Sequence, residues 1–299
     1  MIRGMDFAPG AEWGGESASA SPRIWVQLRD NVDSDGGDAM DLGISGRKAI
    51  VCGASRGIGN AIAVRLAKEG VHLVLAARNA AGLEAAAASI RAEHGVRVET
   101  VATDLAVSEG RRALLAACGD PDILVHNGAW PDENPDFHDW SREDWVRAVD
   151  AMMLSPVELI TGVVDGMKAR GFGRIVAVSS RFVKEPRLEH MLSVSPRLGL
   201  AGFMNGIGRE YARHNVTANA MLTGIFATET QVAFAHELAR RSGKPVDVVW
   251  RERESTNAAA RFGRPDEMAA LCAFLCSVHA GFITAQNILI DGGGYPGVF

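Results

Sequence analysis

The stretch Cys52-Gly53-Ala54-Ser55-Arg56-Gly57-Ile58-Gly59 decides how this chain folds. It follows the short apolar run Lys48–Cys52 and precedes an Ala-rich amphipathic stretch. Its three glycines permit a tight turn, let backbone N–H groups approach a phosphate, and let a helix pack closely on a strand. The octapeptide therefore predicts a strand, a turn and a helix that together cradle the phosphates of a dinucleotide.

Outward from this turn, short β-branched runs alternate with Ala-rich stretches along the chain. Seven of the runs are apolar enough to be covered on both faces, which is typical of strands in a parallel sheet. The alternation predicts an α/β fold, a single doubly wound domain of Rossmann type with helices on both faces. We expect the strands at Lys48–Cys52, Val71–Ala77, Arg97–Ala102, Asp122–His126, Arg174–Ser179, Val216–Met221 and Asn287–Asp291.

Length and composition agree with one soluble domain. The 299 residues, 47% apolar and 22% charged, can bury a sizeable core. A net charge of −5 and the lack of a Lys/Arg run predict no nucleic-acid partner, and no apolar stretch is long enough to predict a membrane span. Because no secretory signal opens the chain, we expect a cytoplasmic protein acting on a small molecule.

The first 39 residues differ from the rest in being rich in Gly, Ser, Ala and Asp. They indicate an N-terminal arm before a dinucleotide-binding and catalytic domain at 40–299. The arm is either a flexible extension or a segment whose Trp13 and Trp25 cover a neighbouring subunit or the entrance of the substrate pocket. The four cysteines lack metal-site spacing, so we expect buried thiols and no metal.

The end of the second strand indicates which dinucleotide is bound. A site specific for NAD usually places a carboxylate there for the ribose 2′-hydroxyl, but the chain has Ala76-Ala77-Arg78-Asn79. Arg78, with Arg56 of the glycine turn, can form a positive fork around the 2′-phosphate of NADP, or both can belong to a solvated loop face. We expect NADP(H) to be preferred over NAD(H).

Several motifs in order resemble the short-chain dehydrogenase/reductase family, from about Leu42 to Gly294. Thr103-Asp104-Leu105 is similar to the family's adenine-contacting segment, and His126-Asn127-Gly128-Ala129 to its Asn-Asn-Ala-Gly segment. Asn219 through Thr228 resembles the segment that closes on the nicotinamide, with Thr223 replacing a proline. The resemblance implies the sheet order 3-2-1-4-5-6-7. Motifs and resemblance together predict cofactor contacts from Gly53, Ser55, Arg56, Gly57, Ile58, Gly59, Arg78, Asp104, Leu105, Asn127, Gly128, Arg197, Gly224, Ile225 and Thr228.

The catalytic positions depart from that family, whose centre uses a serine, a tyrosine, a lysine and an asparagine. The serine is matched by Ser180, but Ser193 stands at the tyrosine position, Arg197 at the lysine position and Met152 at the asparagine position. The chain thus resembles a divergent branch of the family. An aliphatic hydroxyl titrates far above a tyrosine phenol and an arginine does not give up its proton, so this site is a poor autonomous acid. We expect Ser180 to polarise the substrate oxygen, Ser193 or a water to relay the proton, and Arg197 to hold the ribose.

Other proton donors are possible on sequence grounds. His190 lies three residues before Ser193 and titrates in a useful range, although a lone loop histidine is more often solvated. His126 ends a predicted buried strand and is a weaker candidate. Tyr211 and Tyr295 lie far along the chain from Ser193, so neither is an obvious substitute.

These observations favour an atypical NADP(H)-dependent oxidoreductase that reduces a carbonyl or oxidises an alcohol. A lyase, isomerase or cyclase of the same fold, or a non-catalytic dinucleotide-binding subunit, remains open because three catalytic groups are replaced. The resemblance also implies a homodimer or homotetramer packed through helices near Ser141–Arg170 and Ser195–His214. We expect a lid between Gly224 and Arg261 to determine which substrate is bound, and its Phe226, Phe234 and Trp250 to face either the pocket or solvent. Trp130 is expected either beside the nicotinamide or in the core.

Overall fold

The computed structural model describes residues 40–128 and 136–298. The expectations for the arm at residues 1–39, and for Trp130, lie outside the described residues. Within the described part of the chain, no helix is both long enough and apolar enough to cross a bilayer.

Seven parallel strands form one sheet in the order β3-β2-β1-β4-β5-β6-β7, which confirms the predicted fold class and strand order. The order changes direction between β1 and β4, and in sheets of this kind ligands bind at the carboxyl ends of the strands near that point. No strand end differs from its predicted position by more than two residues. The strands are β1 (Lys48–Cys52), β2 (His72–Ala77), β3 (Val98–Ala102), β4 (Ile123–Asn127), β5 (Gly173–Ser180), β6 (Val216–Thr223) and β7 (Asn287–Ile290).

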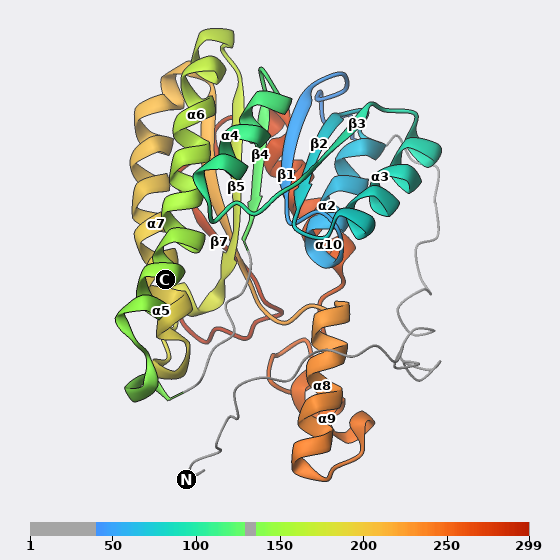
Figure 1. The fold of residues 1–299 in the computed structure, drawn as a ribbon, viewed down its shortest axis with the longest axis vertical. Helices are drawn as coiled ribbons and strands as arrows, with labels where there is room; N and C mark the ends of the chain where they lie inside the picture. Colours follow the sequence, from blue (N-terminus) through green and yellow to red (C-terminus); the bar gives the residue numbers. More distant parts are fainter. Residues whose placement is uncertain (1–39, 129–135, 299) are drawn as a thin grey trace.

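Helices cover both faces of the sheet (Figure 1). One apolar core lies between the sheet and α2 (Gly57–Lys68), α3 (Ala80–His94) and α10 (Pro265–Cys276). The other lies between the sheet and α4 (Ser108–Ala117), α6 (Ser155–Arg170) and α7 (Met191–Tyr211). The strands alternate their side chains between these two cores, which explains why each reads as a continuous apolar run.

The first long helix matches its predicted extent but contains a π-helical segment, and the second begins earlier than predicted. The expected helix near Ser141–Arg170 is α5 (Arg142–Val149), then a π-helical segment at Asp150–Leu154, then α6. A π-helical turn adds a residue to the helix, and apolar spacing alone does not reveal it. The helix expected from Ser195 begins four residues earlier at Met191 and contains Pro196, whose ring removes one backbone hydrogen bond.

Beyond the carboxyl edge of the sheet projects a helical hairpin of α8 (Glu229–Ser242) and α9 (Val246–Glu254) (Figure 1). It has its own small apolar core, in which the rings of Trp250 and Phe262 stack with centroids 4.0 Å apart. Trp250 is therefore part of the hairpin core, and Phe226 belongs to the core between the sheet and α2, α3 and α10. Phe234 is exposed. This hairpin occupies the place of the predicted lid.

Two sets of buried polar groups complete the core. All four cysteines are buried free thiols, as expected, and burial raises the pKa of Cys52 to about 12. Arg174 at the start of β5 is fully buried, and its guanidinium donates to the carbonyl oxygens of Ser277 (3.0 Å), Gly173 (2.8 Å) and Asn215 (2.8 Å). Arg174 thus ties β5 to the starts of β6 and the C-terminal segment.

Candidate active site

The glycine turn between β1 and α2 leaves no room for side chains. Gly53 and Gly57 have φ of +65° and +58°, which favours glycine. A Cβ on Gly59 would lie 2.1 Å from the Gly53 carbonyl oxygen. No side chain caps the first turn of α2 and no acidic residue lies in it, so its N–H groups and its positive dipole end suit an anion. Ser55 and Ile58 lie in this same turn, as predicted.

The end of β4 packs against the glycine turn. The Asn127 side-chain amide donates to the Gly53 carbonyl oxygen at 3.4 Å, and a Cβ on Gly59 would lie 2.8 Å from the same amide. Gly128 is equally confined, because a Cβ there would lie 2.9 Å from Cε1 of His126. The structure therefore brings the predicted glycine turn and the segment after β4 into one site.

Two arginines lie near the glycine turn, one within it and one after the neighbouring strand β2. Arg78 directly follows β2 and Arg56 immediately precedes α2, and both side chains are exposed. Neither forms an ion pair with any residue in the described ranges, and no carboxylate ends β2. Both guanidinium groups are thus available for an anion larger than a single pyrophosphate.

The segment after β3 reaches the same edge, because Ala102 of β3 pairs with Ala77 of β2. The Asp104 carboxylate accepts a hydrogen bond from the Ala106 backbone N–H at 2.9 Å, which shapes the turn into α4. The Leu105 carbonyl oxygen accepts from Arg111 at 2.8 Å. Asp104 and Leu105 accordingly border the candidate site at the place where the sequence predicts them.

Ser180 lies at the carboxyl end of β5, in a row with two neighbouring strands. It pairs with Thr223 of β6, and Thr223 pairs with Ile290 of β7. The Ser180 hydroxyl oxygen accepts a hydrogen bond from the Phe182 backbone N–H at 3.3 Å. A hydroxyl that accepts in this way keeps its own proton available for another oxygen.

Ser193 and Arg197 face each other one helical turn apart on α7, and both are buried. The Arg197 guanidinium donates to the Ser193 carbonyl oxygen at 3.2 Å and to the Ser193 hydroxyl oxygen. The two predicted catalytic side chains therefore form one hydrogen-bonded unit. A permanently charged group bound to a hydroxyl favours negative charge on oxygen nearby.

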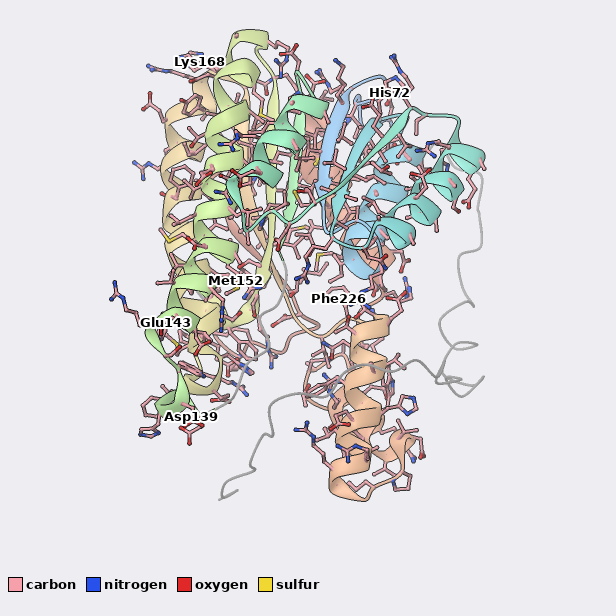
Figure 2. All side chains as sticks on the ribbon, in the orientation of Figure 1. His72, Asp139, Glu143, Met152, Lys168 and Phe226 are labelled. Carbon is pink, nitrogen blue, oxygen red and sulfur yellow. The ribbon has the colours of Figure 1, made fainter. Side chains whose placement is uncertain are left out.

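His126 and Met152 occupy two further positions near this unit. Only 5% of His126 is exposed, and its Nδ1 has no hydrogen-bond partner among the described residues. Burial, with a smaller contribution from the charge of Arg197, lowers the pKa of His126 to about 4, so the ring is neutral at pH 7. Met152 lies in the π-helical segment (Figure 2). It packs in an apolar cluster with Leu192. Its thioether cannot replace the donor and acceptor groups of an asparagine.

Tyr295, which lies far from Ser193 in the sequence, lies near the loop that follows Ser180 in the fold. The side-chain nitrogen of Lys184, four residues after Ser180, lies 6.0 Å from the ring centre of Tyr295. The Tyr295 backbone N–H also donates to the Asp291 carboxylate at 2.7 Å, which turns the C-terminal segment toward β5. Tyr211, in contrast, bonds Asp165 at the far end of α7. His190 stacks on Phe182 with centroids 4.4 Å apart. The sequence signals the contact between Lys184 and Tyr295 only through the strand order, which places β7 two strands from β5.

The start of α8 closes over the glycine turn. Thr228 caps α8 by accepting from the Gln231 backbone N–H at 3.4 Å, and its methyl group lies 3.5 Å from where a Cβ on Gly57 would lie. Gly224 bonds the Ile290 carbonyl oxygen at 3.0 Å, and the Ile225 carbonyl oxygen accepts from Gly263 at 2.9 Å. These contacts place the predicted closing segment across the site.

Known proteins share this arrangement over most of the chain. The family model for short chain dehydrogenase matches residues 47–239. The NADPH-dependent reductase BacG of Bacillus subtilis is 30% identical over 262 residues, which cover 85% of this chain and 100% of that protein. Acetoacetyl-CoA reductase of Shinella zoogloeoides is 31% identical, covering 83% and 98%. The structure of L-sorbose reductase from Gluconobacter frateurii, complexed with NADPH and L-sorbose, has a TM-score of 0.81 and 32% identity, covering 85% and 98%. This chain therefore belongs to the short-chain dehydrogenase/reductase family.

Proposed function

We propose that this protein uses NADP(H) to reduce the carbonyl group of a small molecule, or in reverse to oxidise the alcohol. The observation that carries the proposal is the closed glycine turn, in which a Cβ at Gly59 would lie 2.1 Å from the Gly53 carbonyl oxygen, at the same sheet edge as Ser180. Such a turn fits the pyrophosphate of a dinucleotide. The similarity to proteins named as NADPH-dependent reductases supports it.

Preference for NADP(H) is supported by charge at the end of β2. Arg56 and Arg78 are exposed and unpaired within the described residues, and neither meets a carboxylate that would suit a ribose 2′-hydroxyl. A guanidinium matches the geometry of a phosphate with two parallel hydrogen bonds. The 2′-phosphate of NADP(H) would lie between them.

Bound NADPH would supply the hydride, and the protein supplies binding, orientation and charge. The Ser180 hydroxyl, fixed by the Phe182 N–H, donates its proton in a hydrogen bond to the substrate carbonyl oxygen and polarises it. The Ser193 hydroxyl, fixed by Arg197, likewise keeps its proton for donation. Arg197 stabilises negative charge developing on the substrate oxygen and would hold ribose hydroxyls. A proton from bulk solvent would reach the resulting alkoxide through a water or the Ser193 hydroxyl, in place of the phenol of the usual family centre.

NADPH absorbance, followed with a panel of ketones and enones, tests the proposal. We expect Ser180→Ala to lower kcat about 100-fold, the usual size of one lost oxygen-stabilising donor. Ser179→Ala, which removes the neighbouring hydroxyl, serves as the matched control and should retain activity. Absence of cofactor consumption with every substrate would overturn the proposal.

Two further measurements, of product formation without the dinucleotide and of NADPH binding, separate the alternatives. Product formation that persists after the dinucleotide is stripped would identify a lyase, isomerase or cyclase. Tight NADPH binding without turnover, unaffected by Ser180→Ala, would identify a non-catalytic dinucleotide-binding subunit.

We also propose a homo-oligomer packed through α6 and α7. Leu154 beside α6 and Leu198 on α7 are large apolar side chains left exposed in the single chain. Exposed leucines on neighbouring helices favour burial against a second copy. Light scattering coupled to gel filtration should report a dimer or tetramer, and Leu198→Glu should lower the mass to that of one chain or a smaller assembly.

A further inference from the structure

The loop between Ser180 and α7, residues 181–190, contains Arg181, Lys184 and Arg187, of which Arg181 directly follows the proposed catalytic serine. It starts with a 3-10 turn, in which the Lys184 and Glu185 N–H groups donate to the Arg181 carbonyl oxygen at 2.8 and 3.2 Å. The Ser180 hydroxyl accepts from this same turn. Arg181 and Lys184 are therefore held one and four residues from the hydroxyl that polarises the substrate.

The C-terminal segment meets this loop above the sheet edge. The Asp291 carboxylate accepts from the Gly293 and Tyr295 N–H groups at 3.1 and 2.7 Å, which turns the segment after β7 back toward β5. The nearest Arg181 nitrogen lies only 2.1 Å from where a Cβ on Gly294 would lie. Lys184 points toward the Tyr295 ring, 6.0 Å from its centre.

These two basic side chains thus reach from the end of β5 to the segment after β7. The end of β6 lies between those strands in the sheet, in the row of Ser180, Thr223 and Ile290. The carboxyl ends of parallel strands are where ligands bind in such sheets. Arg181 and Lys184 consequently border the place where a substrate carbonyl meets Ser180.

Two of the three Lys and Arg side chains in this loop form no ion pair with a described residue. Arg187 pairs with Glu185 at 2.6 Å, so its charge is compensated. Arg181 and Lys184 are half-buried and make no ion pair with any residue in the described ranges. The Phe182 ring, 5.2 Å from the Arg181 guanidinium carbon, offers that cation only a partial partner. Partly buried charges without a counter-charge attract an anion.

We propose that Arg181 and Lys184 bind an acidic group of the substrate, so that the substrate is an oxo compound carrying a carboxylate or a phosphate. This inference rests on the proposed reductase function, because it assigns the substrate class of that same site. Arg181 would bind two oxygens of the acidic group in parallel, and Lys184 would contribute a second charge. The carbonyl would then lie within reach of the adjacent Ser180.

Matched pairs of substrates test the assignment. Acetoacetate is compared with acetoacetamide, and dihydroxyacetone phosphate with dihydroxyacetone, by NADPH consumption. We expect kcat/KM to favour an acid over its neutral partner, and the preferred pair to distinguish a carboxylate from a phosphate. Arg181→Met should lower kcat/KM for the acid about 10- to 100-fold more than for the neutral compound, mainly through KM, because a hydrogen-bonded charge is lost.

Arg187→Met is the matched control, since Glu185 already compensates that charge, and it should leave the acid preference unchanged. Equal losses on acid and neutral substrates in Arg181→Met, or no acid preference in the wild type, would overturn the inference while leaving the reductase function standing. A second arm does not need turnover: acetoacetate and glycerol phosphate are titrated into the enzyme with NADP⁺, followed by tryptophan fluorescence. Binding lost in Arg181→Met supports the inference, and no binding of either anion to the wild type overturns it, even where no substrate consumes NADPH and the proposed function itself fails.

Discussion

Replacing His126 by asparagine should change how the stability of this fold depends on pH. In the folded chain burial lowers the pKa of His126 to about 4, whereas an unfolded histidine titrates near 6.5. Between these two values the unfolded chain binds a proton that the folded chain does not bind. Acidification therefore favours unfolding, and the wild type loses stability as the pH falls from about 7 toward 4.

The size of the effect follows from the two pKa values of His126. The difference between 6.5 and about 4 corresponds to about 3 kcal/mol of unfolding free energy at a pH below both. From pH 7 to pH 5 the same linkage removes about 2 kcal/mol, because the folded ring stays neutral while the unfolded ring becomes protonated. An asparagine at this position does not titrate, so the variant lacks this contribution.

Guanidinium chloride titrations at pH 7, 6 and 5 and at constant ionic strength measure the effect. We expect the wild type to lose about 2 kcal/mol more than His126→Asn between pH 7 and pH 5. Equal slopes for the wild type and His126→Asn would refute the reasoning. An NMR titration that finds the wild-type His126 ring titrating near 6.5 would refute it independently of any variant.

Three further substitutions test the site and the core. Gly59→Ala places a methyl group 2.1 Å from the Gly53 carbonyl oxygen, so fluorescence titration should show NADPH binding weakened by at least about tenfold. The control Gly119→Ala adds a methyl group in open space and should bind NADPH as the wild type does. Arg78→Ala should raise KM for NADPH about tenfold and KM for NADH little, and equal changes would show that Arg78 does not contact the 2′-phosphate. Arg174→Met removes a buried donor from three carbonyl oxygens, of which that of Asn215 keeps the hydrogen bond from the Gly173 N–H at 3.1 Å. It should lower the unfolding free energy by about 3 kcal/mol, so an unchanged denaturation midpoint would contradict its role.

Local pattern was sufficient to predict the sheet. Strands covered on both faces are short apolar runs, and glycines in the turn after β1 mark the start of α2, so strand positions and class follow from neighbouring residues. The segment at Asp150–Leu154 was not predictable in this way, because one extra residue in a helical turn barely alters apolar spacing. The existence and extent of this helix were thus predictable, whereas the π-helical segment inside it was not.

The candidate site was predictable only in part for a different reason. Ser180, Ser193 and Arg197 lie at motif positions, but the hydrogen bond that joins Ser193 to Arg197 depends on their rotamers on α7. The neutrality of His126 depends on what covers its strand, and the approach of Tyr295 to Lys184 joins residues more than 100 positions apart. Such effects come from packing between distant segments, which a single sequence does not display.

The hairpin of α8 and α9 has a consequence for how this enzyme can change its specificity. The chain enters the hairpin at Phe226 and leaves it at Gly263, and these two residues form a parallel bridge, reinforced by the bond from the Ala227 N–H to the Gly263 carbonyl oxygen at 2.8 Å. An insertion whose two ends coincide, and whose apolar core is internal, is tolerated as an exchangeable module. Evolution or engineering can therefore exchange the part of the hairpin that follows Thr228 as a cassette, and so redirect the proposed activity to other substrates. Thr228 itself stays over the glycine turn, so the sheet and the dinucleotide site stay as they are.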